Sequence, residues 1–265
     1  MTGIIHLSDL HFGDADPRLV ERAVEAIHGL APDALAVTGD LTQKGRRGEF
    51  DEARVFLDRF ATPQIIAPGN HDTPYAHLFT RAVAPFSRFE RRVANGSGRL
   101  MALGGVWARV LNTARGVQAR FDWSLGAARP RDVTAVAEEL DAAPQGVCRI
   151  VACHHPLETP RNAPFPARTL GGVMAARRFA DAKVDLILSG HLHVAFAEPL
   201  PYADHRTYAI GAATAFSPRT RGEPAGFNHI VVADHSIAVT PHAWDGSDFV
   251  ARAPQELERR VTAAD

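Results

Sequence analysis

Short apolar runs alternate with longer amphipathic segments along most of the chain. The runs lie at residues 4–8, 34–38, 64–67, 149–152 and 185–188. They are rich in Ile, Leu, Val and Ala and are short enough to predict buried strands. After the first run, Asp16 and Pro17 form a helix start, because Asp caps helix N-termini and Pro favours the first helical position. Helical spacing of apolar residues predicts further helices near residues 50–60, 133–140 and 173–182. This alternation predicts an α/β protein in layers.

The remaining segments are less regular. Residues 100–103 and 106–111 read as strands around a Gly-Gly turn, and the part beyond residue 200 as mostly β. The tail after Pro254 is expected to form a short exposed helix. Residues 73–98 lack a clean period, and we expect a helical or irregular, cap-like insertion that covers the site. No repeat or linker interrupts the chain, so residues 1–265 are interpreted as a single domain.

Composition narrows the class of protein. The 265 residues are 46% hydrophobic and 22% charged, as in ordinary globular proteins. A net charge of −1 gives no reason to expect nucleic acid or an anionic membrane as partner, and it indicates no oligomeric state. The first residues lack the features of a signal peptide and no apolar run could cross a bilayer, so a cytoplasmic location is expected. Cys148 and Cys153 are interpreted as small core residues rather than a disulfide framework.

Five of the apolar runs are followed directly by polar residues that can bind metals. These residues are Asp9 with His11, Asp40, Asn70 with His71, His154, and His191 with His193. In α/β sheets, sites form beyond the carboxyl ends of the strands, so the five groups should converge. Carboxylates, an amide oxygen and imidazoles suit ions such as Mn, Fe, Zn or Co. One bridging carboxylate would join two ions roughly 3.5–4 Å apart, a spacing that suits phosphoryl displacement.

In their order and spacing, these groups resemble the calcineurin-like metallophosphoesterase superfamily. The blocks that carry the resemblance are Asp9-Leu10-His11, Gly39-Asp40, Gly69-Asn70-His71-Asp72, His154 and Gly190-His191-Leu192-His193. The resemblance implies a four-layer α/β/β/α sandwich with a dinuclear metal centre at one edge.

The resemblance also implies a role for each residue of the blocks. The implied ligands of the first ion are Asp9, His11 and His193, those of the second are Asn70, His154 and His191, and Asp40 is the implied bridge. A hydroxide bridging the ions would attack phosphorus in line. His71 would protonate the leaving oxygen or stabilise transition-state charge, with Asp72 orienting its ring.

The loop after the second strand indicates a branch of the superfamily. Gly39-Asp40-Leu41-Thr42 followed by Gly45 is similar to bacterial cyclic-nucleotide and glycerophosphodiester phosphodiesterases. Leu111-Asn112-Thr113 departs from the Leu-Asp-Thr or Leu-Asp-Ser common in that group. We therefore expect hydrolysis of a small phosphodiester of the cytoplasm, a cyclic nucleotide or a glycerophosphodiester. The alternatives are a phosphomonoesterase, a nucleotide pyrophosphatase, a nuclease, which the balanced charge disfavours, and a non-catalytic scaffold.

Four further residues are candidates for substrate contact. His77 follows the central block closely, and His155 lies beside a predicted ligand, where packing and substrate contact are equally expected. Arg219 and Arg221 lie in a polar segment after the last block, and a guanidinium matches phosphate oxygens. A solvated loop is the competing interpretation of that segment.

Overall fold

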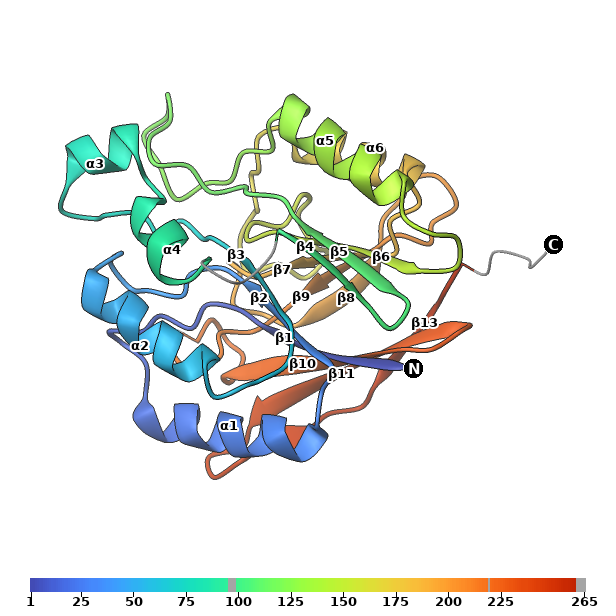
Figure 1. The fold of residues 1–265 in the computed structure, drawn as a ribbon, viewed down its shortest axis with the longest axis horizontal. Helices are drawn as coiled ribbons and strands as arrows, with labels where there is room; N and C mark the ends of the chain where they lie inside the picture. Colours follow the sequence, from blue (N-terminus) through green and yellow to red (C-terminus); the bar gives the residue numbers. More distant parts are fainter. Residues whose placement is uncertain (95–98, 219, 261–265) are drawn as a thin grey trace.

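Two β-sheets lie face to face between two layers of helices (Figure 1). The structure is a computed structural model that describes residues 1–94, 99–218 and 220–260. Helices α1 and α2 cover one sheet, and helices α5 and α6 cover the other. The predicted α/β/β/α sandwich is therefore confirmed.

The first sheet contains seven strands in the order β12-β11-β10-β1-β2-β3, with β13 also paired to β11. Their bounds are β1 (Thr2–Leu7), β2 (Ala34–Thr38), β3 (Gln64–Ala67), β10 (Gly226–Val232), β11 (Ser236–Trp244), β12 (Phe249–Ala251) and β13 (Gln255–Glu258). Strands β1, β2 and β3 run parallel, and β10 pairs antiparallel with β1. The three parallel strands therefore end at the same edge.

The second sheet contains six strands in the order β4-β5-β6-β7-β9-β8. Their bounds are β4 (Leu100–Leu103), β5 (Val106–Val110), β6 (Cys148–Ala152), β7 (Leu186–Ser189), β8 (Phe196–Pro199) and β9 (Tyr208–Gly211). Strands β5, β6, β7 and β9 are parallel, and only the two edge strands pair antiparallel. The carboxyl ends of β6 and β7 are thus neighbours as well.

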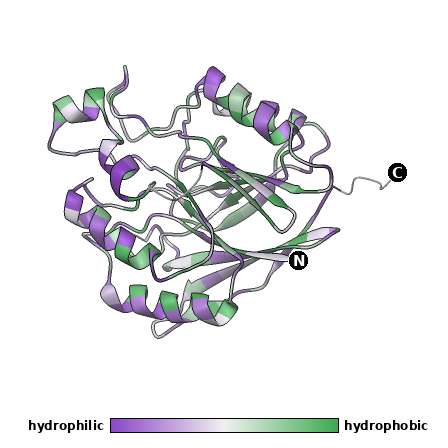
Figure 2. Cartoon of the chain, viewed as in Figure 1, coloured by the Kyte–Doolittle hydropathy of each residue, from purple (hydrophilic) through white to green (hydrophobic). Residues whose placement is uncertain are grey.

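The helices are amphipathic, and their apolar stripes are visible along α1 and α5 (Figure 2). Their bounds are α1 (Pro17–Leu30), α2 (Arg47–Leu57), α3 (Leu78–Val83), α4 (Ser87–Arg92), α5 (Pro130–Asp141) and α6 (Gly172–Asp181). The predicted start of α1 is confirmed, since the Asp16 carboxylate accepts the backbone N–H of Arg18 at 2.9 Å and Pro17 is the first helical residue.

Each sheet buries both faces, which explains the unbroken apolar runs. In β1, Ile4 packs between the two sheets, whereas Ile5 packs toward α1 and α2. In β6, Ile150 packs between the sheets and Val151 packs toward α5 and α6. Three apolar layers therefore hold the four structural layers together and fix the strand ends where the site forms.

The described residues after Pro254, 255–260, contain the strand β13 where a short helix was predicted, so that prediction is wrong for this part of the chain. β13 pairs antiparallel with β11, with Val239 opposite Gln255 and Ser236 opposite Glu258. This pairing buries Leu257 between the sheets and satisfies backbone groups that β11 would otherwise expose. Tertiary pairing thus overrides the local sequence preference.

The irregular segment at residues 73–98 contains helices α3 and α4, and its last residues, 95–98, lie outside the described part. Helix α4 packs Phe89 into the core beneath α2, whereas α3 buries none of its residues. Within the described ranges, no helix combines the length and apolarity needed to cross a bilayer.

Candidate metal centre

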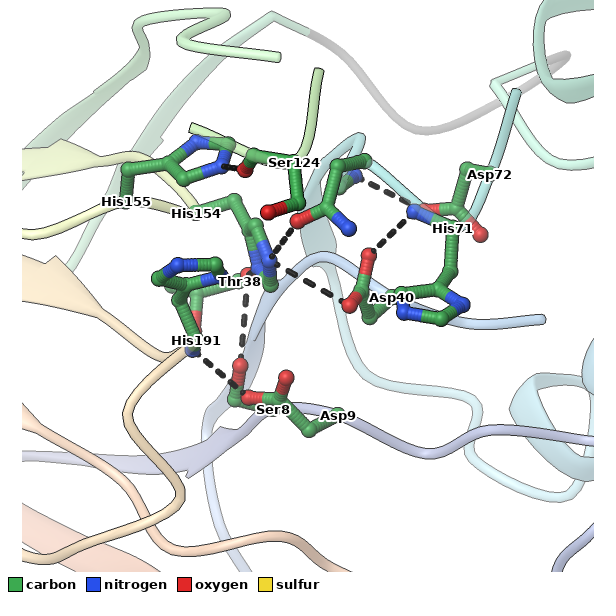
Figure 3. A network of polar contacts seen from close by, with 12 residues as sticks. Ser8, Asp9, Thr38, Asp40, His71, Asp72, Ser124, His154, His155 and His191 are labelled. Atoms are coloured by element: carbon green, nitrogen blue, oxygen red, sulfur yellow. Dashed lines mark hydrogen bonds and ion pairs between the residues drawn. The ribbon is translucent and has the colours of Figure 1, made fainter. Parts of the chain in front are cut away.

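The carboxyl ends of five strands from both sheets meet at one edge of the sandwich. Strands β1, β2 and β3 lead into Asp9, Asp40 and Asn70, and strands β6 and β7 lead into His154 and His191. Figure 3 shows Asp9, Asp40, His154 and His191 pointing toward a common centre. All seven predicted ligands are buried, with at most 8% of each residue exposed.

The backbone at this edge adopts a conformation that L-residues rarely use. Asp9, His11, Asp40, His191 and His193 all have φ between 49° and 66°. Left-handed conformations are uncommon outside glycine and concentrate at functional sites, although Asp and His tolerate them better than most residues. Each such residue turns the chain sharply after its strand and directs its side chain across the edge.

Asp9, His11 and His193 form one group of candidate ligands, whose ligand atoms lie within 4.8 Å of one another. Nε2 of His193 lies 3.1 Å from Asp9 Oδ1, and Nε2 of His11 lies 3.8 Å from the same oxygen. Within the described part of the chain, this buried Asp9 oxygen accepts no hydrogen bond. The other oxygen, Oδ2, accepts the backbone N–H of His191 at 2.9 Å, which fixes the carboxylate.

Around His154, three electron-pair donors converge. Its Nδ1 lies 2.8 Å from the carbonyl of Thr38; a carbonyl only accepts, so Nδ1 carries the proton. Nε2 of the neutral ring is then an acceptor, yet it faces Asn70 Oδ1 at 3.1 Å and Asp40 Oδ2 at 3.4 Å. Three acceptors so placed are stable only around a cation or a proton. Asp9, Asp40 and His154 also form a group with ligand atoms within 4.8 Å, which places Asp40 next to both sets.

The electrostatics of the site fit a metal centre. Burial lowers the pKa of His11 to about 4 and that of His191 to about 3, which keeps both imidazoles neutral, as ligands must be. Burial also opposes a charged His154, but the Asp40 carboxylate outweighs it and raises the pKa of His154 to about 9. The site without an ion therefore binds a proton where the resemblance places the second metal.

His71 lies beside this centre, and its ring is oriented differently from the prediction. Its Nδ1 hydrogen bonds to the carbonyl of Gln43 at 2.8 Å, and its backbone N–H donates to Asp40 Oδ1 at 2.8 Å. Asp72 instead accepts the backbone N–H groups of Thr42 and Gly69, at 3.0 and 2.8 Å. The prediction that Asp72 orients the His71 ring is therefore wrong. Asp72 is buried and joins two loops of the site.

His155 is also buried, and both of its ring nitrogens contact the protein. Nδ1 lies 2.9 Å from Thr113 Oγ1, and Nε2 lies 2.7 Å from the carbonyl of Ser124. Its ring packs against that of His191, with the ring centroids 4.5 Å apart. Of the two roles left open for His155, these contacts match packing behind the ligands, and the prediction of substrate contact does not fit them.

The other predicted contact residues lie around the centre. Arg221 stacks its guanidinium over the ring of Phe165 at 4.3 Å, and Phe165 meets the ring of His191 edge-on at 6.0 Å. His77 is exposed at the start of α3, in a hollow lined by arginines. Arg219 lies outside the described residues.

Sequence reasoning missed the residues that hold the ligands through their backbones. The carbonyls of Thr38 and Gln43 fix the rings of His154 and His71, and the Thr214 hydroxyl donates to the Asp9 carbonyl at 2.8 Å. Backbone carbonyls leave no signature in residue type. Only the position of Thr38, as the last residue of a strand that ends at the site, could have suggested it.

Residues 2–195 match the family model of the calcineurin-like phosphoesterases. The match spans most of the chain and includes every block around the centre. The chain therefore belongs to the calcineurin-like phosphoesterase family.

Individual relatives are distant. The chain is 29% identical over 289 residues to a cAMP/cGMP dual specificity phosphodiesterase from Mycobacterium tuberculosis, a match that covers 97% of this chain and 85% of that protein. It is 32% identical over 94 residues to a glycerophosphodiester phosphodiesterase from Enterobacter lignolyticus, which covers 31% of this chain and only 34% of that relative's length. A dimetal phosphatase from Danio rerio has the same fold, with a TM-score of 0.68 over 98% of this chain and 99% of that chain at 12% identity.

Proposed function

We propose that this protein is a metal-dependent phosphodiesterase that hydrolyses a small diester, either a cyclic nucleotide or a glycerophosphodiester. The observation that carries the proposal is the convergence of His154 Nε2, Asp40 Oδ2 and Asn70 Oδ1 on one point, an arrangement that needs a cation or a proton at its centre. Two relatives support the choice of a diester: one phosphodiesterase is similar to nearly the whole chain, and the other is similar to about a third of it.

Two ions fit the donor set. Asp9, His11 and His193 would hold one, Asn70, His154 and His191 would hold the other, and Asp40 would contact both. When bound, the ions supply an activated water for attack on phosphorus and neutralise charge on the phosphate oxygens. Mn, Fe, Zn and Co all suit two carboxylates, one amide oxygen and several imidazoles.

His71 is suited to protonate the leaving oxygen. Because the Gln43 carbonyl accepts the proton on Nδ1, Nε2 is the ring atom left to carry an exchangeable proton. The backbone N–H of His71 donates to Asp40, which ties the residue that bears this ring to the predicted bridging carboxylate. The Gln43 carbonyl, rather than Asp72, thus has the orienting role.

Arg221 is suited to bind the substrate beyond the scissile bond. Its stacking on Phe165, which in turn contacts the His191 ring, places a guanidinium at the rim of the centre. A planar guanidinium can bind two phosphate oxygens, or stack on a base while it pairs with an oxygen. The proposal also includes two sequence-based predictions: the insertion that contains α3 and α4 covers the site, and Arg219 contacts the substrate.

The test measures metal content and turnover on the same proteins. Purified protein loaded with Mn should bind two ions per chain and hydrolyse bis-p-nitrophenyl phosphate. Asn70→Ala should lower the content to one ion. His71→Ala should keep both ions and lose about 10²–10⁴ in turnover, the usual contribution of a general acid. His235→Ala, in the exposed turn between β10 and β11, is the matched control.

The outcomes separate the alternatives. A protein that binds no metal and leaves the diester intact would be a non-catalytic scaffold. A protein that prefers p-nitrophenyl phosphate over its diester would be a monoesterase. Loss of metal in His71→Ala would show that His71 is a ligand rather than a proton donor. A panel of cyclic nucleotides, glycerophosphodiesters and nucleotide sugars then identifies the substrate.

A further inference from the structure

A hollow of about 530 Å³ lies between helices α2, α3 and α4, outside the predicted metal ligands. We call it the basic hollow, and its lining residues are Arg46, Arg47, His77, Thr80 and Arg88. Three arginines and a histidine line it without an acidic residue, although the whole chain carries a net charge of −1. The positive charge is therefore concentrated here and does not reflect the average composition.

The backbone positions these arginines around the start of a helix. Arg46 is the N-cap of α2 and Arg47 its first residue, so the positive end of the 11-residue helix points toward the hollow. Arg88 reaches over from α4, where its Nη1 donates to the carbonyl of Gly45 at 2.6 Å. This bond fixes the guanidinium against the loop that precedes α2. The hollow thus combines three guanidinium groups, a helix N-terminus and the Thr80 hydroxyl.

Only one of the three arginines of the hollow pairs with a carboxylate in the part of the chain that the structure describes. Among the described residues, no carboxylate lies within salt-bridge distance of Arg47 or Arg88. Arg46 pairs with Glu49, with its Nε 3.9 Å from Glu49 Oε1. The other oxygen, Oε2, accepts the backbone N–H groups of Lys44 and Arg46. An electropositive concave surface of this kind attracts anions.

The basic hollow adjoins the proposed general acid. The carbonyl that holds the His71 ring belongs to Gln43, three residues before Arg46. The Cα atoms of Gln43 and Arg46 are therefore within about 11 Å of each other. His77 follows His71 by six residues, and Gly45 lies close to the Thr73 carbonyl, which joins the two loops. The hollow therefore lies near the loop that holds the His71 ring.

We propose that the basic hollow binds a second phosphate group of the substrate, separate from the diester that is cleaved. The proposal rests on the phosphodiesterase function proposed above and narrows its substrate to diesters with a terminal phosphate. Guanidinium groups bind phosphate in bidentate geometry, and a dianionic monoester gains more from three of them than a diester with one charge. His77, predicted as a substrate contact, would act from this hollow.

A matched pair of substrates tests the proposal. The dinucleotides ApA and pApA contain the same diester and differ only in a terminal phosphate. With Mn-loaded protein, kcat/KM for pApA should exceed that for ApA about tenfold, as expected for partly exposed charge-assisted contacts. In Arg47→Gln/Arg88→Gln the ratio should fall to about one, because both unneutralised guanidinium groups are lost.

A control variant separates local binding from the general effect of charge. Arg18→Gln/Arg131→Gln removes the same charge from side chains that are 82% and 80% exposed on α1 and α5. This variant should keep the wild-type ratio. Equal kcat/KM for ApA and pApA in the wild type would overturn the proposal, and so would an equal loss of preference in both double variants.

A binding measurement keeps the test decisive if neither dinucleotide is hydrolysed. That result would count against the phosphodiesterase function but not against the basic hollow. Calorimetry on Mn-loaded protein would then use the same pair with an uncleavable methylphosphonate in place of the diester. Tighter binding of the phosphorylated analogue, lost only in Arg47→Gln/Arg88→Gln, would support the hollow, and equal binding of both analogues would refute it.

Discussion

Gly190 follows β7 of the second sheet and packs against Ser8 and Asp9, which follow β1 of the first sheet, so replacing it with alanine tests the assigned ligands. A Cβ atom at Gly190 would lie 1.7 Å from Ser8 Oγ and 2.4 Å from Asp9 Oδ2. The φ angle of Gly190 is outside the left-handed region, so alanine meets no backbone conflict there. Any effect of the substitution must therefore come from the space that the methyl group takes.

The size of the effect follows from these distances. A carbon–oxygen contact needs about 3.3 Å, so the Asp9 carboxylate must move by roughly 1 Å. Metal ligands tolerate deviations of only about 0.2 Å. We expect Gly190→Ala to weaken metal binding at the Asp9 site at least about 100-fold and to destabilise the metal-free protein by about 1–3 kcal/mol, as overpacking does.

Calorimetric titration with Mn measures the first effect, and urea denaturation in the presence of a chelator measures the second. Gly29→Ala is the control, since a Cβ there has no neighbour within 4 Å. In the double variant Ser8→Gly/Gly190→Ala the hydroxyl clash is gone, so part of the stability should return while metal binding stays weak. Wild-type affinity for both ions in Gly190→Ala would refute the assignment of Asp9 as a ligand.

Three further predictions concern the surrounding structure. Thr42→Val removes a hydroxyl that donates to Asp72 at 3.0 Å and should lower the free energy of unfolding by about 1–2 kcal/mol in urea, with Thr42→Ser near wild type. Burial raises the pKa of Cys153 to about 12, so almost no thiolate exists at pH 8. A thiol reagent should therefore label Cys153 in the native protein only as fast as the protein unfolds, and rapid labelling would contradict this. Phe216 is fully buried, with its ring centroid 5.0 Å from that of Phe56. Phe216→Ala should therefore lower the free energy of unfolding by about 3–5 kcal/mol. A urea midpoint near wild type would show that this layer is loosely packed.

The layers and the convergence of ligands could be predicted because they follow from local patterns. Apolar runs such as 34–38 and 64–67 match β2 and β3 to the residue, since both faces of these strands are buried. Neighbouring parallel strands end at the same edge of the sheet. The residues that follow them therefore lie close together, independently of the conformation of the loops. The order of polar groups along the chain was thus enough to bring Asp9, Asp40 and His154 together.

The orientation of each ring could not be predicted, because it depends on contacts that span the chain. His154 receives its orientation from Thr38, which is 116 residues away in the other sheet. The resemblance implies that Asp72 orients the His71 ring, but Asp72 lies in the turn after β3, where its carboxylate accepts the backbone N–H groups of Thr42 and Gly69. Gln43 has that role through a carbonyl, which every residue possesses. Likewise, the Gln- and Glu-rich segment of β13 becomes a strand only because β11 offers it an edge.

Because the candidate ligands come from both sheets, the centre can form only at a late stage of synthesis of the polypeptide. The candidate ligands run from Asp9 to His193, and the last two follow β7. A nascent chain that has not yet released this segment from the ribosome has the carboxylates but lacks the imidazoles that complete either set. Both candidate ligand sets are therefore complete only after β7 and the loop that follows it have been made, while β8 to β13 are still to come. An ion bound there would link residues of the first sheet to residues of the second.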